Sequence, residues 1–199
     1  MPSEPQALRL FVACPIPGDV IRALSAIQSD LRTAGFDRLR YVRPEGMHIT
    51  LKFLGAVQPD RVAAITTKLS SAIQPLELRL SIERLGGFGG SRLRVVWAGL
   101  SGDLAVLASL AGQVEEALEP LGFPRENRPF APHLTLARVR DEAAPDERSR
   151  HAAFVDAYKL PALPPILVTE VVLMRSNLGP GGAVYERLMT FPAEARETS

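Results

Sequence analysis

The sequence has little of several residue types, and each scarcity excludes a class of protein. The 199 residues include one cysteine, Cys14, so a disulfide within the chain is impossible and a cysteine-based zinc site is not expected. We expect Cys14 to be a small buried thiol. Charge of either sign is not in excess, with 23 Lys and Arg against 22 Asp and Glu. That balance is too weakly basic for a protein that coats duplex DNA. It fits a small anionic ligand or the end of a nucleic acid, without deciding between them.

Long apolar runs are also missing. No stretch approaches the roughly 18 apolar residues of a membrane span, and the N-terminus lacks the basic and apolar regions of a signal peptide. We therefore expect a cytoplasmic protein with no membrane partner. Hydrophobic residues still make up 46% of the chain, enough for a sizeable core in one domain or in two small lobes packed together.

Apolar patterning predicts eight strands and three amphipathic helices. The helices carry the stripes Val20–Leu31, Val62–Ile73 and Leu104–Leu118, with the first ending near Gly35 and the third at Gly122. Several strands follow one another without a helix between them, which favours an α+β fold with mainly antiparallel sheet. The strands are expected at Arg9–Ala13, Leu39–Val42, Met47–Leu54, Leu76–Leu85, Leu93–Leu100, His133–Val139, Leu167–Arg175 and Ala183–Phe191.

The remaining segments have simpler interpretations. Asp141–Arg150 is charged and is expected to be a solvated loop leading into a short helix near Phe154. Gly179–Gly182 is expected to form a hairpin turn. Residues 193–199 are expected to be a tail.

The chain has only three histidines, and two of them open the same four-residue phrase. The first phrase is His48-Ile49-Thr50-Leu51 and the second is His133-Leu134-Thr135-Leu136. From the composition, two such matches among three histidines arise by chance about once in ten thousand sequences. A lone histidine in a strand is more often structural than catalytic, but the duplication favours a functional pair.

Each phrase places an imidazole and a hydroxyl on one face of a strand, because side chains alternate between the two faces. Two copies facing each other would line a cleft with two imidazoles and two hydroxyls. Hydrolysis of a cyclic phosphate needs a base for water and an acid for the leaving ribose oxygen, and two histidines can hold these opposite protonation states. Threonine hydroxyls can donate hydrogen bonds to phosphate oxygens. The set is complete without a metal, and neither phrase contains a carboxylate.

Two basic residues near the phrases are candidate substrate contacts. Strict alternation puts Lys52 on the same face as His48 and Thr50, where its charge would favour an anion. The alternative is a solvated lysine at the end of the strand. Arg138 closes the second phrase, and the same alternation points it away from His133. A phosphate role for Arg138 therefore requires a bulge or the end of the strand.

The phrases as they are written, HITLKFLG and PHLTLAR, resemble the two-histidine (2H) phosphoesterase superfamily. Within it, the chain is most similar to the bacterial and archaeal RNA 2′,3′-cyclic phosphodiesterases, also called 2′-5′ RNA ligases. The similarity extends to RLFVACPIP at the start, to Gly87-Phe88 and RLRVVWAGL in the middle, and to VVLMRSNLGPGGAVYERL at the end. It covers about Leu8 to Phe191.

The resemblance implies a fold and an activity. The fold is a single bilobal domain over residues 1–199, with a core at about 8–191. Its two antiparallel-rich sheets and outer helices are related by a pseudo-two-fold axis, with one phrase from each lobe in a central cleft. The activity is hydrolysis of RNA or nucleotide 2′,3′-cyclic phosphates to 2′-phosphates without a cofactor. The reverse reaction, which joins tRNA halves through a 2′-5′ bond, needs no ATP.

The resemblance also implies residue roles. His48 and His133 match the catalytic pair, and Thr50 and Thr135 match the residues that hold the phosphate. Arg138 matches the arginine that often follows the second phrase. A provisional assignment has His48 protonate the leaving 3′ oxygen and His133 activate water, and the pseudo-symmetry leaves the reverse assignment open.

Other signals are weaker. The resemblance implies that Phe88 contacts the base or ribose, and the alternative is a core residue. Trp97 is expected in the core. Residues 86–90 are glycine-rich but lack the setting of a phosphate-binding loop, so a flexible turn is expected. Arg125 and Arg128 could guide an RNA strand through its phosphates or belong to a solvated loop. His151 has no threonine partner and is expected at the surface.

Two other functions compete with the phosphodiesterase. One is a non-catalytic module that binds RNA ends or nucleotides at the same residues. The other is a metallohydrolase with the two histidines as ligands, which the lack of nearby Asp, Glu or Cys disfavours. The expected partners are RNA ends with a 2′,3′-cyclic phosphate or cyclic nucleotides, bound by a monomer.

Overall fold

The computed structural model describes residues 6–36, 39–140, 144–179 and 182–192. These residues form nine strands, four α-helices and four short 3₁₀ helices. The strands are β1 (Leu8–Pro15), β2 (Arg40–Tyr41), β3 (His48–Val57), β4 (Leu78–Phe88), β5 (Val95–Gly102), β6 (His133–Arg138), β7 (Ile166–Val168), β8 (Val171–Gly179) and β9 (Gly182–Phe191). The α-helices are α1 (Gly18–Thr33), α2 (Val62–Ala72), α3 (Leu104–Leu118) and α4 (Pro145–Ala157). The 3₁₀ helices are η1 (Pro44–Gly46), η2 (Pro59–Arg61), η3 (Gly90–Arg92) and η4 (Glu119–Leu121).

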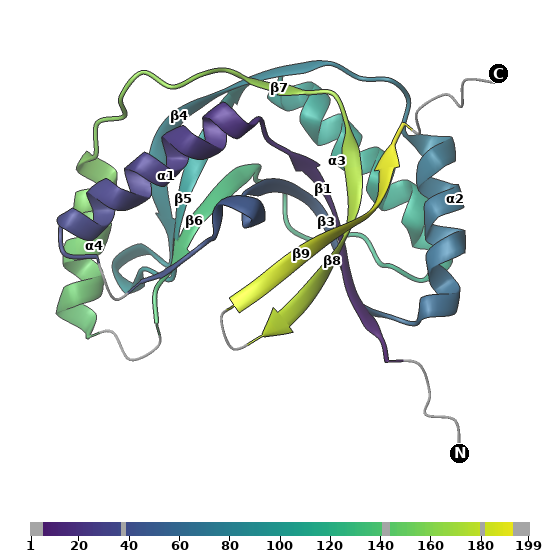
Figure 1. Ribbon diagram of the computed structural model, residues 1–199, viewed down its shortest axis with the longest axis horizontal. Coiled ribbons are helices and arrows are strands. Elements are labelled where there is room, and N and C mark those ends of the chain that lie inside the picture. Colours follow the sequence, from purple (N-terminus) through teal and green to yellow (C-terminus); the bar gives the residue numbers. More distant parts are fainter. Residues whose placement is uncertain (1–5, 37–38, 141–143, 180–181, 193–199) are drawn as a thin grey trace.

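The strands form one curled antiparallel sheet in the order β7-β4-β5-β6-β3-β1-β8-β9 (Figure 1). The short strand β2 pairs with β6 beside this order. The predicted α+β class with mainly antiparallel sheet is confirmed. The two expected sheets are two halves of this one sheet. A single pair, Ile49 of β3 with Leu134 of β6, joins the half β7-β4-β5-β6 to the half β3-β1-β8-β9. The junction between the halves therefore falls between the two histidine phrases.

The helices cover the sheet in two groups. In Figure 1, α1 and α4 lie on the left of the molecule, and α2 and α3 lie on the right. The predicted stripes face the core. The four stripe positions of α1 are fully buried, and so are Val114 and Leu118 of α3. Burial of a Leu, Ile or Val side chain contributes about 1.5–3 kcal/mol relative to exposure, so these stripes fix the helices on the sheet. No helix within the described ranges is long and apolar enough to cross a membrane.

The two halves repeat a helix ending. After α1, Gly35 has a φ of 91°, and the Phe36 amide donates to the Leu31 carbonyl at 3.0 Å. After α3, Gly122 has a φ of 80°, and the next amide donates back to Leu118 in the same way. Both are helix C-termini that require a residue in the left-handed region, which favours glycine.

Along the chain, α1 lies between β1 and β3, and α3 lies between β5 and β6. Each of these two helices nevertheless packs on the strand that carries the phrase of the other chain repeat. α1 contacts β6, and α3 contacts β3. Each phrase is therefore held from behind by the helix of the opposite repeat.

Three predicted segments differ from the structure. α4 begins at Pro145, inside the stretch expected to be a loop, because proline is well suited to the first turn of a helix. The strand expected at Leu167–Arg175 is two strands, β7 and β8, which lie in opposite halves of the sheet. The glycine-rich turn begins only at Gly89, since residues 86–88 belong to β4.

Other predictions fall partly beyond the described residues. β8 and β9 form the expected antiparallel hairpin, and Gly179 pairs with Gly182. Pro180 and Gly181 of the predicted turn lie outside the described residues, as do residues 141–143 of the predicted loop and the tail from residue 193.

Candidate active site

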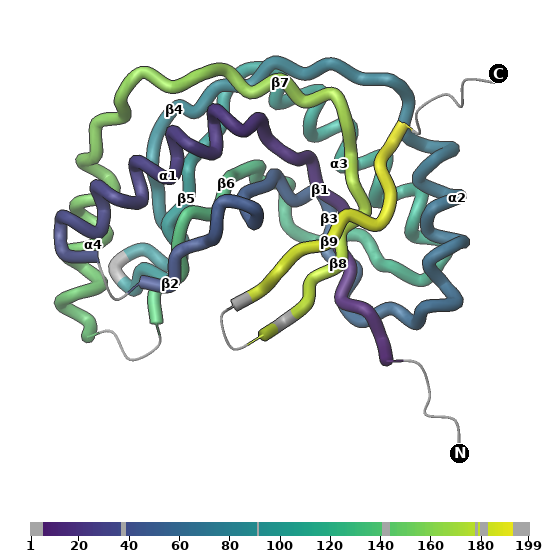
Figure 2. The backbone as a smooth tube through the Cα atoms, in the orientation of Figure 1, coloured from purple at the N-terminus to yellow at the C-terminus, as the bar shows by residue number. Residues whose placement is uncertain are grey.

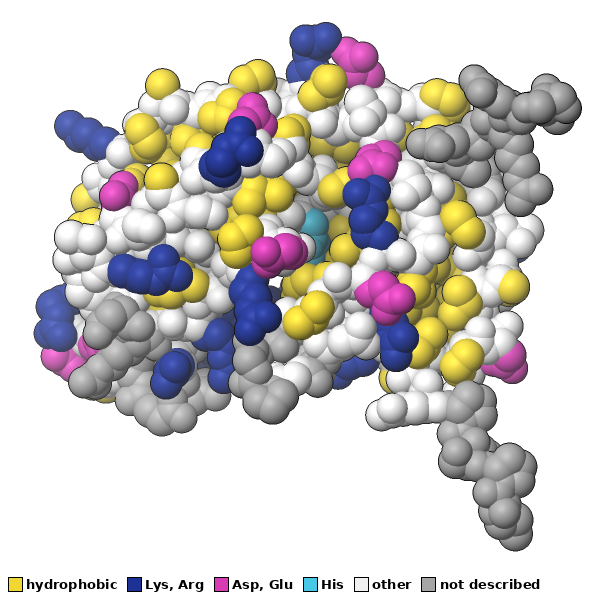
Figure 3. Space-filling view, viewed as in Figure 1, with side chains coloured by type: hydrophobic (Ala, Val, Ile, Leu, Met, Phe, Trp, Pro, Cys, Tyr) yellow, Lys and Arg dark blue, Asp and Glu magenta, His cyan; other side chains and the backbone are white. Residues whose placement is uncertain are grey.

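The two phrases lie side by side on adjacent antiparallel strands. Because Ile49 pairs with Leu134, the antiparallel register puts His48 opposite Thr135 and Thr50 opposite His133. Ile49 and Leu134 are fully buried, while the four polar side chains are partly exposed on the other face of the sheet. We call this face the site face. Figure 3 shows a histidine side chain at the bottom of a hollow near the middle of the molecule.

This arrangement brings all four predicted side chains together. Residues directly opposite on antiparallel strands have Cβ atoms about 4.5–5.5 Å apart, and diagonal neighbours lie about 7–8 Å apart. The two histidines are diagonal neighbours, and the charge of His133 acts on His48. Imidazoles at diagonal positions on one face can both reach a small anion bound beside them.

Both phrases contain a β-bulge at their fourth residue, a leucine. In β3, Thr50 and Lys52 pair with consecutive residues of β1, so Leu51 is the extra residue. In β6, Leu136 likewise lies between two residues that pair with consecutive positions of β5. A bulge interrupts the regular alternation of the strand, so residues after it change faces relative to strict alternation.

His133 is oriented by its own backbone. Its Nδ1 lies 2.8 Å from the carbonyl oxygen of Ala131. A carbonyl can only accept, so Nδ1 carries the hydrogen and Nε2 is the nitrogen available on the site face. The Phe88 ring and the imidazole meet edge to face, with ring centroids 5.0 Å apart.

His48 lies in an aromatic setting. Its ring stacks on Phe11 with centroids 4.7 Å apart and meets Tyr185 of β9 at 5.3 Å. Among the described residues, the buried Nδ1 has no partner at hydrogen-bond geometry. The carbonyl of Gly46, also two residues earlier, is near enough to favour the charged ring. Burial is the largest cause that lowers the pKa of His48 to about 4, and the positive charge of His133 is a smaller cause in the same direction. At neutral pH, His48 is therefore an uncharged imidazole that can accept a proton.

The profile of the 2′-5′ RNA ligase superfamily matches residues 17–180. The chain belongs to the 2′-5′ RNA ligase superfamily. The resemblance drawn from the two phrases is thereby confirmed.

Two curated relatives in this superfamily are named RNA 2′,3′-cyclic phosphodiesterase. The one from Methanocaldococcus jannaschii is 31% identical over 180 residues, which cover 90% of this chain and 97% of that protein. The one from Archaeoglobus fulgidus is 33% identical over 186 residues, covering 92% and 99%.

Solved structures share the fold. The protein TT0787 of Thermus thermophilus superposes with a TM-score of 0.72 at 27% identity, covering 94% of this chain and 100% of that chain. LigT of E. coli, solved in complex with 3′-AMP, superposes with a TM-score of 0.71 at 26% identity, covering 96% and 100%.

In this 2′-5′ RNA ligase superfamily member, the bulge at Leu136 turns Arg138 toward the site face. Arg138 pairs with Val95, and Val95 pairs with Phe88, so the three form one row across β6, β5 and β4. Val95 lies two residues before Trp97, the partner of Thr135, and so shares its face. The structure thus supplies the bulge that a phosphate role for Arg138 requires.

The expectation that Lys52 shares the face of His48 and Thr50 is wrong. The bulge at Leu51 turns Lys52 to the helix side, where only 3% of the residue is exposed. Its ammonium donates to the Pro124 carbonyl at 2.7 Å and forms an ion pair with Glu115 of α3. Lys52 thus ties the first phrase to the helix behind it.

Removing the charge of Glu115 leaves a buried ammonium without a counter-ion. We expect Glu115→Gln to lower the free energy of unfolding by about 3 kcal/mol, the effect typical of breaking a buried ion pair. Urea denaturation at pH 7 measures it. Glu116→Gln, at the exposed next position of the same helix, is the matched control, and a loss no larger than that of the control would contradict the stabilising role of the ion pair.

Phe88 and Trp97 extend the site face beside His133. Phe88 is 40% exposed and lies 5.4 Å from Trp97, measured between ring centroids. The indole lies on the backbone of Gly86, where an added Cβ would come within 2.3 Å of the ring. Trp97 was expected in the core, but it is only partly buried because its ring lies over glycine on the site face.

The other predictions have mixed outcomes. Cys14 is fully buried, and burial with the nearby Glu170 charge raises the pKa of its thiol to about 12. Arg125 forms an ion pair with Glu119 at 2.8 Å. No group of three or more His, Cys, Asp or Glu residues that could hold a metal occurs in the described part of the chain.

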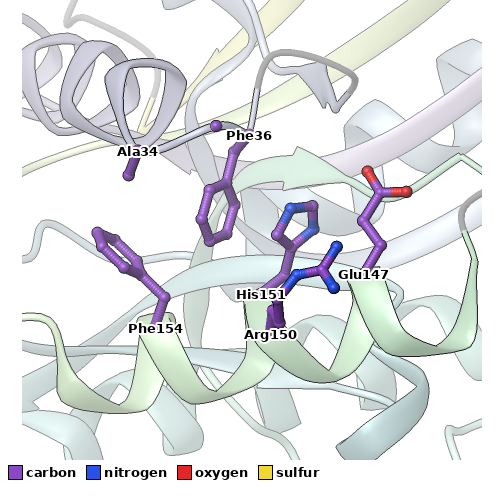
Figure 4. A pocket seen from close by; sticks show the side chains of 7 residues that line it. Ala34, Phe36, Glu147, Arg150, His151 and Phe154 are labelled. Carbon is purple, nitrogen blue, oxygen red and sulfur yellow. The ribbon is translucent and has the colours of Figure 1, made fainter.

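His151 is not at the surface. It is 5% exposed and stacks on Phe36 with ring centroids 3.9 Å apart. Together with Phe154, Glu147 and Arg150 it lines a cavity of about 490 Å³ between the end of α1 and α4 (Figure 4). Neither histidine phrase contributes to this cavity.

Sequence reasoning missed Phe11 and Tyr185, which hold the His48 ring. They come from β1 and β9, far apart in the sequence, and each is an ordinary aromatic residue in a strand. No local signal marks them, since only the pairing of β1 with β3 and β8 and the curl of the hairpin bring them to the imidazole.

Proposed function

We propose that this chain hydrolyses RNA or nucleotide 2′,3′-cyclic phosphates to 2′-phosphates, with His48 and His133 as the acid–base pair. The observation that carries the proposal is the pairing of Ile49 with Leu134, since it puts two imidazoles and two hydroxyls around one position on the site face. The names of the relatives from M. jannaschii and A. fulgidus support the same chemistry.

In the proposed reaction, neutral His48 takes a proton from water as the water oxygen attacks phosphorus. The bond between phosphorus and O3′ breaks, and His133 gives its proton to the leaving O3′. The product keeps the phosphate on O2′. Each positioned proton transfer contributes typically ~10²–10⁴-fold to the rate.

This assignment reverses the provisional one, and the buried setting of His48 is the reason. A base must be uncharged to accept a proton, and His48 is uncharged at neutral pH because burial lowers its pKa to about 4. Thr50 and Thr135 donate hydrogen bonds to the non-bridging phosphate oxygens, which carry the growing negative charge.

The same groups can join two RNA ends. When the 5′-hydroxyl of another RNA end replaces water, His48 takes the proton of that hydroxyl and His133 again protonates the leaving O3′. The product is a 2′-5′ phosphodiester, and the strain of the cyclic phosphate takes the place of ATP. In cleavage of that bond the two histidines exchange roles, as microscopic reversibility requires.

The test is turnover of 2′,3′-cyclic AMP in excess chelator, with the product identified by ³¹P NMR. We expect 2′-AMP, at a rate that chelator does not change. Tight binding without product would instead support a non-catalytic module. Activity that is lost with chelator and restored by Zn²⁺ or Mn²⁺ would support the metallohydrolase, and either result would overturn the proposal.

The pH dependence of kcat/KM follows from the role of His48. As the base it is inactive when protonated, so kcat/KM should fall as the pH drops through about 4. Return to pH 7 after each acid exposure controls for unfolding. An acid limb centred near 6.5, the ordinary pKa of histidine, would contradict this assignment.

A further inference from the structure

Two arginines lie directly opposite each other at the edge of the site face. Arg40 of the two-residue strand β2 pairs with Arg138 of β6. Figure 2 labels β2 toward the lower left of the molecule. Both side chains are exposed. Like charges at directly opposite positions destabilise a strand pair. An anion that both guanidinium groups can reach would offset the repulsion between the two arginines.

The backbone next to Arg40 is fixed, which sets the direction of its side chain. Tyr41 turns toward α1, where its hydroxyl donates to the Phe36 carbonyl at 2.7 Å and its ring lies 3.9 Å from the Arg32 guanidinium. Tyr41 pairs with the fully buried Ala137, on the core side of β6. Neighbouring residues of a strand face opposite ways, so Arg40 points to the site face.

Neither arginine is neutralised by a carboxylate of the described residues. Within those ranges, the ion pairs involve Lys52 and the arginines at positions 79, 125, 150, 175 and 187, but not Arg40 or Arg138. A planar guanidinium binds phosphate with two parallel hydrogen bonds, and two of them can clamp one phosphodiester from both sides.

The pair lies about one nucleotide from the histidines. Arg138 is the next residue after Thr135 to face the site, roughly 7 Å along the strand, which is close to the spacing of successive phosphates in a nucleic-acid strand. Phe88 occupies the same cross-strand row and its ring touches His133. An exposed aromatic ring beside a phosphate-binding site can stack on a base.

We propose that Arg40 and Arg138 together bind the phosphodiester on the 5′ side of the terminal cyclic nucleotide. The inference rests on the proposed function and deepens it. The site is built for the end of an RNA chain, and a free cyclic mononucleotide leaves the arginine pair unused.

The test compares one substrate that lacks this phosphate with two dinucleotides that differ only in its charge. They are 2′,3′-cyclic AMP, the dinucleotide ApA with a 2′,3′-cyclic phosphate, and that dinucleotide with an uncharged methylphosphonate linkage. We expect kcat/KM for the charged dinucleotide to exceed the other two by about tenfold, the effect of one hydrogen-bonded charge contact.

Arg40→Gln should lower kcat/KM for the charged dinucleotide about tenfold and leave the other two substrates within about twofold. Arg40→Lys should restore part of the loss because it keeps the charge. Arg9→Gln, at an exposed arginine in β1, is the matched control and should change none of the three. A wild type that does not prefer the charged linkage, or an Arg40→Gln variant that slows all three substrates equally, would overturn the inference.

Failure of the proposed function is distinguishable. If the wild type turns over none of the three substrates, calorimetric binding of the corresponding 2′-phosphates makes the same comparison without catalysis. A preference for the charged linkage that disappears in Arg40→Gln would support the arginine pair, and its absence would overturn it.

Discussion

Replacement of either His48 or His133 by alanine is expected to lower kcat for 2′,3′-cyclic nucleotides by about a thousandfold, within the range of one lost proton transfer. The two effects should not multiply in the double variant, because the histidines act in one concerted step and lose their function together. Single-turnover rates at pH 7 measure all three variants.

The third histidine is the control for this pair. His151 is buried against Phe36, away from both phrases, so His151→Gln should lower the free energy of unfolding while kcat stays within about twofold. If His48→Ala or His133→Ala kept its rate within tenfold of the wild type, the acid–base pair would be wrong.

Removing the hydroxyls of the phrases is expected to have the next largest effect. Thr50→Val and Thr135→Val keep the shape of the side chain and delete the hydrogen-bond donor. Each should lower kcat/KM by about a hundredfold, as loss of one donor to a developing oxyanion does. The loss should fall mainly on kcat, because the phosphate oxygens carry most charge in the transition state.

Thr67→Val is the matched control for the threonine variants. Thr67 is exposed on α2, and its hydroxyl donates to the Ala63 carbonyl of the same helix. Its replacement should leave kcat/KM unchanged. Unaltered kinetics in both Thr50→Val and Thr135→Val would mean that the hydroxyls do not hold the phosphate.

Much of the fold could be predicted because it depends on local patterns. The stripes of α1 and α3 and the alternation in β3 and β6 follow from the spacing of apolar residues, and the glycines at 35 and 122 mark helix ends. The repeated Leu-x-x-x-Gly-Phe at Leu31–Phe36 and Leu118–Phe123 is also a local pattern. It indicates the internal repeat as clearly as the histidine phrases do.

The bulges could not be predicted, and they determine on which face of the sheet Lys52 and Arg138 lie. A bulge depends on how a neighbouring strand pairs, so nothing within HITLK or HLTLAR reveals the extra leucine in each. Strict alternation therefore put Lys52 on the site face and Arg138 on the other, and the bulges exchange them. The surroundings of His48 and the burial of His151 likewise depend on contacts between distant segments.

A crystal structure with bound nucleoside 2′-phosphate tests the central claim most directly. We expect the phosphorus to lie between the Nε2 atoms of His48 and His133, with the hydroxyls of Thr50 and Thr135 on its oxygens. A phosphate that touches only one of the two phrases, or that binds in the cavity between α1 and α4, would contradict the account.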